Sequence, residues 1–411
     1  MTGPSDRFRA AASGPRGRKR QREDSGGGKP AVIAAAEPAD GRSQSGAKSS
    51  GAVKVRRSGR GRAKRSQLPA YGALDLGTNN CRLLVARPSR RGFFVIDAFS
   101  RIIRLGEGVT RSGRFSQEAM GRTIEALMVC AEKMKQRRVK RSRVIATEAC
   151  RIAENSAEFI ARVREEAGLE LEVVSQETEA QLAVSGCASL LDPNSDWALV
   201  FDIGGGSSEL IWLDLRDVKP GGRGAGCSRV DIQSRIADWI SLRLGVVTLA
   251  EKHGGHVVTN DTYEAMVEDV IGELATFKAQ NKLHSEVENN RVHLMGTSGT
   301  VTTIAGIHLA LTAYDRSRVD GCWLQTCEVR DVSSRLIAMS YEERVAQPCI
   351  GPERADLVLA GCAILEAVLR TWPCMRLRVA DRGLREGMLA NLMEQDGYPE
   401  WRRKSRRGTT G

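Results

Sequence analysis

Apolar and polar positions along residues 69–395 follow two alternating patterns. Short apolar runs of strand length, among them "AYGALDL", "RVIAT", "WALVFDI" and "RVHLMG", end in turns of small or polar residues. Between them lie longer segments with helical periodicity, such as Ser116 to about Arg137 and "QETEAQLAVSGCASLL". Strands that alternate with helices in this way predict an α/β protein.

Two of these strand-turn-strand segments share one frame. "DLGTNNCRLLVA" (75–86) and "DIGGGSSELIWL" (202–213) both read as Asp, an apolar residue, Gly, a small polar turn and a second apolar strand. The match predicts two similar α/β domains that face each other across a cleft. We place them at residues 69–192 and 193–395, with "DPNSD" (192–196) as the break and the last helix returning to the first domain.

The positive charge of the chain belongs to its two ends. The 411 residues have a formal net charge of +12, but residues 1–70 alone carry +12 and residues 401–411 carry +5, which leaves −5 for residues 71–400. We expect basic disordered tails at 1–68 and 396–411, because these segments lack the apolar content to form a core. Such tails are suited to nonspecific contact with polyanions or nucleic acid, or are solvated segments with no selected partner.

Cysteine usage and hydropathy point to a reduced, cytoplasmic protein. None of the ten cysteines forms a CxxC pair, and most lie in apolar runs. No apolar run reaches the roughly 20 residues needed to span a bilayer, and the N-terminal segment has no apolar signal core. We therefore expect neither a structural zinc site nor a membrane association.

The glycine turns are candidates for binding phosphate. Backbone N–H groups in a glycine-rich turn converge on an anion without obstruction by Cβ atoms, and Ser207 and Ser208 add hydroxyl donors. Asp75 and Asp202 occupy matching places, where each can hold a divalent cation or orient a water molecule. The alternative is a pair of ordinary β-hairpins with glycine bulges.

A third turn, "GTSGT" (296–300), joins an apolar strand to a helix. The free N–H groups at that helix N-terminus favour an anion, although a plain strand-to-helix connection would have the same pattern. Two matched turns together with this third one favour phosphate chemistry.

The segment "SQETEAQLA" supplies a candidate base. Ser175 is a helix N-cap residue, with Glu177 and Glu179 in the first turn. Acidic residues there ordinarily serve helix electrostatics alone. Hydrolysis of a phosphoanhydride also needs a carboxylate that orients or deprotonates water, and Glu179 is the candidate.

At this point the chain resembles the exopolyphosphatase and guanosine pentaphosphate phosphohydrolase (Ppx/GppA) family. Seven motifs carry the resemblance in the family's order: "DLGTNN" (75–80), "RLGEG" (104–108), "ATEACRIAEN" (146–155), "SQETEA" (175–180), "DIGGGSSEL" (202–210), "GTSGT" (296–300) and "ADRGLREG" (380–387). The resemblance implies two ribonuclease-H-like domains, of the kind found in actin, sugar kinases and heat-shock ATPases, around an interdomain cleft.

The resemblance also implies roles for individual residues. Glu179 matches the family's catalytic glutamate, and Asp75, Asp202 and Glu209 match its acidic residues, which we expect to bind Mg²⁺. The positions expected to hold phosphate are Thr78, Asn79, Arg151, Gly204, Gly205, Gly206, Ser207, Ser208, Thr297, Ser298 and Gly299. For Arg151 a plain surface arginine is the alternative. Asp381, Arg385 and Glu386 are expected to stabilise the hinge.

Two departures from the family pattern concern substrate contacts. Gln181 stands where many relatives have arginine, and none of the five histidines is followed by Asp, as in the C-terminal helical module of longer members. The chain resembles the short, two-domain members. The basic tails are candidates to replace that module in holding long polymers.

The resulting expectation is a Mg²⁺-dependent exopolyphosphatase that removes terminal phosphate from inorganic polyphosphate. The nearest alternative is a guanosine pentaphosphate 5′-phosphohydrolase, since both reactions share this chemistry. Alternatives of another class are a kinase or ATPase of the same fold and a polyanion- or RNA-binding protein that acts through its tail. Dimers are common in the family, so a homodimer is expected.

Overall fold

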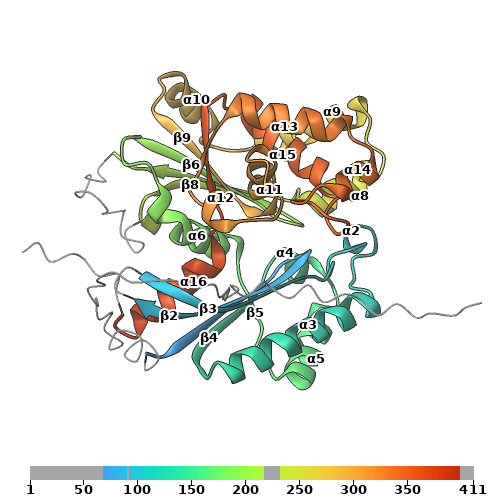
Figure 1. Ribbon diagram of the computed structural model, residues 1–411, viewed down its shortest axis with the longest axis vertical. Coiled ribbons are helices and arrows are strands. Elements are labelled where there is room, and N and C mark those ends of the chain that lie inside the picture. Colours follow the sequence, from blue (N-terminus) through green and yellow to red (C-terminus); the bar gives the residue numbers. More distant parts are fainter. Residues whose placement is uncertain (1–67, 90–91, 217–231, 399–411) are drawn as a thin grey trace, which may run out of the picture. The chain divides into compact units, whose positions relative to one another are not determined.

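The computed structural model describes residues 68–89, 92–216 and 232–398 (Figure 1). All of them belong to one compact unit, Ser58–Gly411. The predicted tails lie outside the described residues, apart from Leu68 and the stretch from Asp396 to Tyr398. The division into two domains at residue 192 remains a prediction, and the two sheets of the unit are therefore described in turn.

The first sheet is mixed, with the strand order β3-β2-β1-β4-β5. Its strands are β1 (Ala70–Leu76), β2 (Asn80–Ser89), β3 (Gly92–Ile102), β4 (Val139–Ala146) and β5 (Glu172–Val173). The central strand β1 pairs antiparallel with β2 and parallel with β4. Six of its seven residues are buried, because helices cover both faces of the sheet at this strand.

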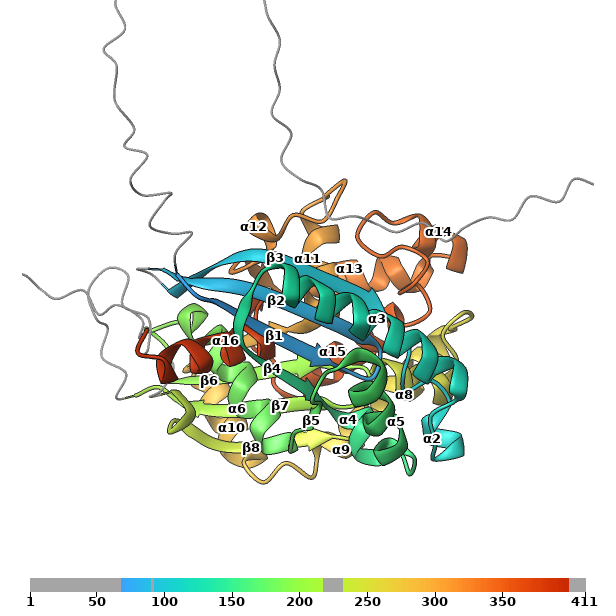
Figure 2. The same ribbon diagram turned by 90° about the horizontal axis from the view of Figure 1, so that it is seen from below.

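Successive residues of β1 serve opposite faces of this sheet. Leu74 and Leu76 pack with α3 (Gln117–Gln136), whereas Tyr71 and Ala73 pack with α16 (Leu384–Gln395). Figures 1 and 2 show α3 and α5 on one side of the sheet and α16 on the other. The remaining helices of this half are α2 (Val109–Ser112), α4 (Glu148–Ile152), α5 (Ser156–Arg162), which continues as a π-helical turn over Val163–Ala167, and α6 (Gln176–Cys187). Ser116 caps α3, as the sequence predicted, by accepting a hydrogen bond from the Ala119 amide.

The second sheet repeats this plan, with the order β10-β11-β9-β6-β7-β8. Its strands are β6 (Trp197–Ile203), β7 (Ser208–Asp214), β8 (Ile236–Leu242), β9 (Val292–Thr297), β10 (Trp323–Gln325) and β11 (Arg376–Ala380). The strand β6 pairs antiparallel with β7 and parallel with β9, as β1 does with β2 and β4. The α/β fold is thereby confirmed, and both glycine turns are hairpin turns at equivalent places.

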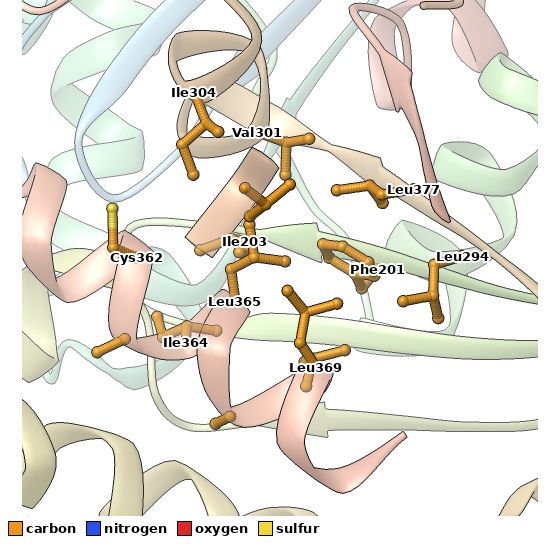
Figure 3. Close-up of a cluster of buried hydrophobic side chains, with 14 of the residues drawn as sticks. Phe201, Ile203, Leu294, Val301, Ile304, Cys362, Ile364, Leu365, Leu369 and Leu377 are labelled. Carbon is orange, nitrogen blue, oxygen red and sulfur yellow. The ribbon is translucent and has the colours of Figure 1, made fainter. Parts of the chain in front are cut away.

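The second sheet carries the larger apolar core. The helices of this half are α8 (Val246–His253), α9 (Asn260–Leu274), α10 (Gln280–Glu288), α11 (Ser298–His308), α12 (Arg316–Val319), α13 (Thr326–Ala338), α14 (Tyr341–Ala346) and α15 (Val358–Thr371). Figure 3 shows the contact of α11 and α15 with the sheet, made by Phe201, Leu294, Val301, Ile304, Ile364, Leu365 and Leu369. Each fully buried side chain of this size contributes about 1.5–3 kcal/mol through its burial.

The helices α6 and α16 cross at close range and connect the two sheets. A Cβ atom on Gly186 would lie 1.8 Å from the carbonyl oxygen of Gly383, and one on Gly387 would lie 2.1 Å from that of Leu182. Neither position therefore tolerates a side chain. The helix α16 follows β11 of the second sheet and packs on β1 of the first sheet.

The end of α16 is fixed to the first sheet by hydrogen bonds and ion pairs. The carboxylate of Asp396 accepts from the Tyr71 hydroxyl at 2.7 Å and pairs with Lys140 and Arg141. The folded body therefore extends beyond residue 395, where the sequence placed the start of the tail. Among the described residues, no helix is both long and apolar enough to cross a membrane.

Candidate active site

Both glycine turns, the start of α6 and the start of α11 line one pocket of about 1010 Å³, including its open mouth. The first sheet and its helices contribute Asp75, Gly77, Thr78, Asn79, Asn80, Arg82, Thr147, Glu148, Glu179 and Leu384. The second contributes Asp202, Ile203, Gly204, Gly205, Gly206, Ser207, Glu209, Val246, Ser298, Gly299, Thr300, Thr303, Arg354, Leu357 and Val358. The pocket lies where the parallel strands of both sheets end, the usual place for ligand sites in such folds.

The glycines of the second turn allow it to pack directly against the first. A Cβ atom on Gly205 would lie 3.0 Å from Thr78 Cβ and 3.1 Å from the backbone nitrogen of Asn79. A Cβ atom on Gly206 would lie 2.7 Å from Thr78 Oγ1. We predicted these glycines from the need for room around an anion. The structure adds a second reason, because the two turns contact each other and any side chain would separate them.

Several buried polar atoms of the pocket lack a protein partner. The side-chain oxygens of Asn79, Asn80 and Ser298 are buried and make no hydrogen bond. Leaving such a group unpaired costs about 1–3 kcal/mol. Ser298 also has a backbone φ of 96°, which is strained for a residue with a side chain. Unpaired polar atoms and backbone strain at one place are typical of a ligand-binding site.

Three carboxyl groups lie at the strand ends, with Glu209 buried and Asp75 and Asp202 half-buried, and their partial removal from water disfavours their charged forms. Burial is the main cause that raises the pKa of Asp202 to about 6, and the charge of Asp75 raises it further. For Glu209, burial and then the charge of Asp202 raise the pKa to about 7, although the hydroxyls of Ser207 and Ser241 donate to its carboxylate at 2.7 and 3.0 Å. Burial also raises the pKa of Asp75. The three groups therefore favour a cation between them.

Glu179 lies in the first turn of α6, whose N-cap Ser175 accepts from the Thr178 amide as expected. Arg151 Nη1 donates to Glu179 Oε2 at 2.8 Å and to the carbonyl oxygen of Val174 at 2.9 Å. The same guanidinium pairs with Glu148 at 2.8 Å. Burial and the charge of Glu209 nevertheless raise the pKa of Glu179 well above its ordinary value. A carboxyl group with a raised pKa is suited to accept a proton near neutral pH.

Three predicted phosphate contacts do not line the pocket. The guanidinium of Arg151 is engaged by two glutamates, which orients Glu179 instead of presenting a free cation to the pocket. The hydroxyl of Ser208 donates to the carbonyl of Leu244 at 2.7 Å. The side chain of Thr297 hydrogen-bonds Asp202. The other eight predicted phosphate positions, together with Glu179 and the three acidic residues, do line it.

Two arginines of the pocket were missed by the sequence reasoning. Arg82 Nη2 and Arg354 Nη1 each lie 3.8 Å from the point that a Cβ atom on Gly299 would occupy, so both guanidinium groups meet at the start of α11. Burial, followed by the charges of Arg385 and Arg354, lowers the pKa of Arg82 to about 10. Arg82 could have been found from the predicted hairpin, because it lies directly opposite Asp75 in the β1–β2 register.

The segment expected to form the hinge makes contacts across the second half of the chain. Glu386 accepts from the Gly383 amide at 3.0 Å and from Arg316 at 2.7 Å, and Asp381 accepts from the Tyr314 hydroxyl at 2.8 Å. These bonds fix the start of α16. Burial raises the pKa of Asp75 and the charge of Arg385 partly offsets that rise, so Arg385 also acts on the pocket.

The pocket fits Mg²⁺ in one particular way. Among the described residues, no three Asp, Glu, His or Cys side chains form a cluster that could hold a metal ion by themselves, so Asp75, Asp202 and Glu209 do not make a protein-only cage. Magnesium is usually held by one or two carboxylates, with water and substrate phosphate as the remaining ligands. Buried carboxylates beside the unpaired Asn80 oxygen match that mode.

Comparison with known proteins agrees with this geometry. Residues 84–396 match the Ppx/GppA phosphatase family. Exopolyphosphatase 2 of Mycobacterium tuberculosis is 29% identical over 312 residues, which cover 74% of this chain and 91% of that protein. The crystal structure of an exopolyphosphatase-like protein matches with a TM-score of 0.68 at 26% identity, and the match covers 79% of this chain and 99% of that protein's chain. The Ppx/GppA family member of Aquifex aeolicus has a TM-score of 0.61 at 26% identity, with coverages of 80% and 99%. The chain belongs to the Ppx/GppA phosphatase family.

Proposed function

We propose that this chain is an exopolyphosphatase, a hydrolase that releases terminal orthophosphate from inorganic polyphosphate. One observation carries the proposal: a single pocket holds the carboxylates of Asp75, Asp202, Glu209 and Glu179 together with two converging arginines, Arg82 and Arg354. A chain of phosphates needs cations and N–H donors along its length, and its hydrolysis needs a carboxylate at the end. The relatives that bear the name exopolyphosphatase support the same reading.

The phosphate chain binds first, through groups that carry no other partner. Gly205, Gly206 and the start of α11 present backbone N–H groups, and the Asn79 and Ser298 side chains supply unpaired polar atoms. Arg82 and Arg354 neutralise phosphate oxygens next to Gly299. Binding of this kind also offsets the desolvation of the buried polar atoms.

Hydrolysis follows at the terminal phosphorus. Glu179 accepts a hydrogen bond or a proton from a water molecule, whose oxygen attacks phosphorus in line with the bridging oxygen. The bridging P–O bond breaks, which yields orthophosphate and a chain shorter by one phosphate. Arg151 holds the Glu179 carboxylate in place through its 2.8 Å ion pair, and Glu148 in turn fixes Arg151.

Asp75, Asp202 and Glu209 supply oxygen ligands for Mg²⁺, which when bound neutralises charge on the phosphate oxygens. Without a cation, these three carboxylates repel an incoming phosphate. Burial is the main cause of their raised pKa values, and the charge of Asp75 on Asp202 and of Asp202 on Glu209 adds to it.

Substrate choice is tested by orthophosphate release from long-chain polyphosphate, tripolyphosphate, guanosine pentaphosphate and ATP, each offered separately with Mg²⁺. The proposal expects release from polyphosphate at a kcat/KM above that for either nucleotide. A higher kcat/KM for guanosine pentaphosphate would assign the chain to the alarmone reaction instead. Release from ATP alone would point to an ATPase.

A further inference from the structure

A concentration of positive charge lies at the end of the first sheet that faces away from the pocket. Seven of the eleven residues from Lys133 to Arg143 are Lys or Arg, and none is acidic. This segment contains the end of α3, the connection to β4 and the first half of β4. Since β4 runs from there to Thr147 in the pocket, seven residues at about 3.3 Å each separate Lys140 from the pocket lining by roughly 23 Å.

Ion pairs neutralise only part of this charge. Lys133 and Arg137 share Asp97, and Lys140 and Arg141 share Asp396. Arg143 pairs with Glu172. Seven cations thus face three carboxylate partners. Lys135 and Arg138 are both exposed and have no carboxylate within salt-bridge distance in the described part of the chain. We name the exposed residues Lys135, Arg137, Arg138 and Lys140 the basic edge.

Helix electrostatics explain only part of the basic edge. Cations in the last turn of α3 complement the helix dipole, which accounts for Lys133 and Lys135. Arg138 follows the C-cap of α3 with a backbone φ of 52°, at the position where helices usually have glycine. An arginine is strained there, and its side chain is exposed to solvent. Residue 138 therefore carries a positive charge although its backbone conformation is strained for arginine.

The first and last described residues lie at the same end of the sheet. Arg87 donates to the carbonyl oxygen of Leu68, which stands two residues before the start of β1. The ring of Tyr398 packs edge-on against Tyr71 at 6.5 Å. Leu68 and Tyr398 therefore both lie at this end of the sheet, and the sequence before Leu68 and after Tyr398 is basic.

We propose that the basic edge binds the distal part of the same polyphosphate chain whose terminal phosphate lies in the pocket. The inference rests on the proposed function. The folded body carries a net negative charge between residues 71 and 400, so a polyanion is held only where cations gather locally. Exposed Lys and Arg side chains attract a phosphate chain through their charge, and within the described residues Lys135 and Arg138 have no carboxylate partner that competes for it. A long chain spans both sites, and a short one occupies the pocket alone.

The test compares two double variants in a Glu179→Gln background, which prevents turnover during binding. Lys135→Gln/Arg138→Gly removes two charges of the basic edge, and glycine at residue 138 relieves the backbone strain, so Tm is expected to stay equal or rise. Lys278→Gln/Arg335→Gln removes two exposed charges from the second half, one between α9 and α10 and one on α13, as a control with the same change in charge. Dissociation constants are measured for long-chain polyphosphate and for tripolyphosphate.

The basic-edge variant is expected to raise Kd for long chains roughly threefold to tenfold, leave Kd for tripolyphosphate unchanged and weaken the salt dependence of long-chain binding. An unchanged Kd for long chains overturns the proposal, and so does an equal rise for both ligands. If the variant instead loses affinity only for a single-stranded oligonucleotide, the edge binds nucleic acid and the proposal is wrong. Tripolyphosphate hydrolysis by the otherwise unaltered chain tests the proposed function separately.

Discussion

The buried carboxyl group of Glu209 predicts a particular dependence of stability on pH. Its pKa is raised from an ordinary value of 4.5 to about 7, so the folded chain holds this proton more tightly than the unfolded chain does. The contribution of Glu209 to stability is therefore fully present below pH 4.5 and is lost as the pH rises to about 7. Over that interval the loss amounts to about 3 kcal/mol, at about 1.4 kcal/mol per pH unit.

The substitution Glu209→Gln isolates this effect, because the amide keeps the shape and does not titrate. Thermal unfolding of both proteins is followed by circular dichroism from pH 4.5 to 8, with a chelator present. The Tm of the variant is expected to rise relative to that of the unaltered chain by on the order of 5 °C across the interval. Mg²⁺ is expected to stabilise the unaltered chain more than the variant above pH 7. Parallel Tm curves across the whole range would refute the reasoning.

Three further predictions concern contacts around the pocket. Arg151 partly offsets the rise in the pKa of Glu179, so Arg151→Gln should raise that pKa further and move the acidic limb of the pH–rate profile to higher pH. An acidic limb at the same pH in the variant would contradict the positioning role of Arg151. Gly206→Ala should lower kcat/KM, because the new methyl group clashes with Thr78 Oγ1. The double variant Gly206→Ala/Thr78→Ala should recover part of the lost kcat/KM. If the losses in kcat/KM from the two single changes simply add, this clash is not the cause. Arg104→Gln breaks a bidentate pair with Asp356, two residues from Arg354, at 2.9 and 3.1 Å. We expect KM to rise roughly threefold with kcat unchanged, measured by steady-state kinetics.

The strands and helices of both halves could be predicted from the sequence, because local patterns determine them. The hairpins around Asp75 and Asp202, the capped start of α3 at Ser116 and the capped start of α6 at Ser175 all follow from apolar period and cap chemistry. The segment "LELEVVS" (169–175) has the apolar pattern of a strand of about seven residues, but β5 pairs with β4 through only two residues. An edge strand has one neighbour, so its length depends on tertiary contacts that the local pattern does not contain.

The residues of the pocket could be predicted only in part, because some of them are brought together by tertiary contacts. Residues on the turns could be assigned to the pocket, since glycine-rich segments between apolar strands identify the turns in the sequence. Arg354 lies in a connecting segment without periodicity, and its approach to Gly299 depends on how that segment packs. Arg151 looked like a phosphate contact because a basic residue near a motif suggests one. Its pair with Glu148 is an i,i+3 contact within α4, but its pair with Glu179 depends on the distance between α4 and α6, which no local pattern encodes.

The most direct test of the proposed hydrolysis compares two glutamates in the first turn of α6. Glu179 lines the pocket, whereas Glu177 is exposed on the same turn, so Glu177→Gln is a matched control for Glu179→Gln. Orthophosphate release from polyphosphate with Mg²⁺ is measured for both variants. We expect Glu179→Gln to lower kcat by about 10²- to 10⁴-fold while Glu177→Gln stays near the unaltered rate. Equal activity of the two variants would contradict the assignment of Glu179 as the base.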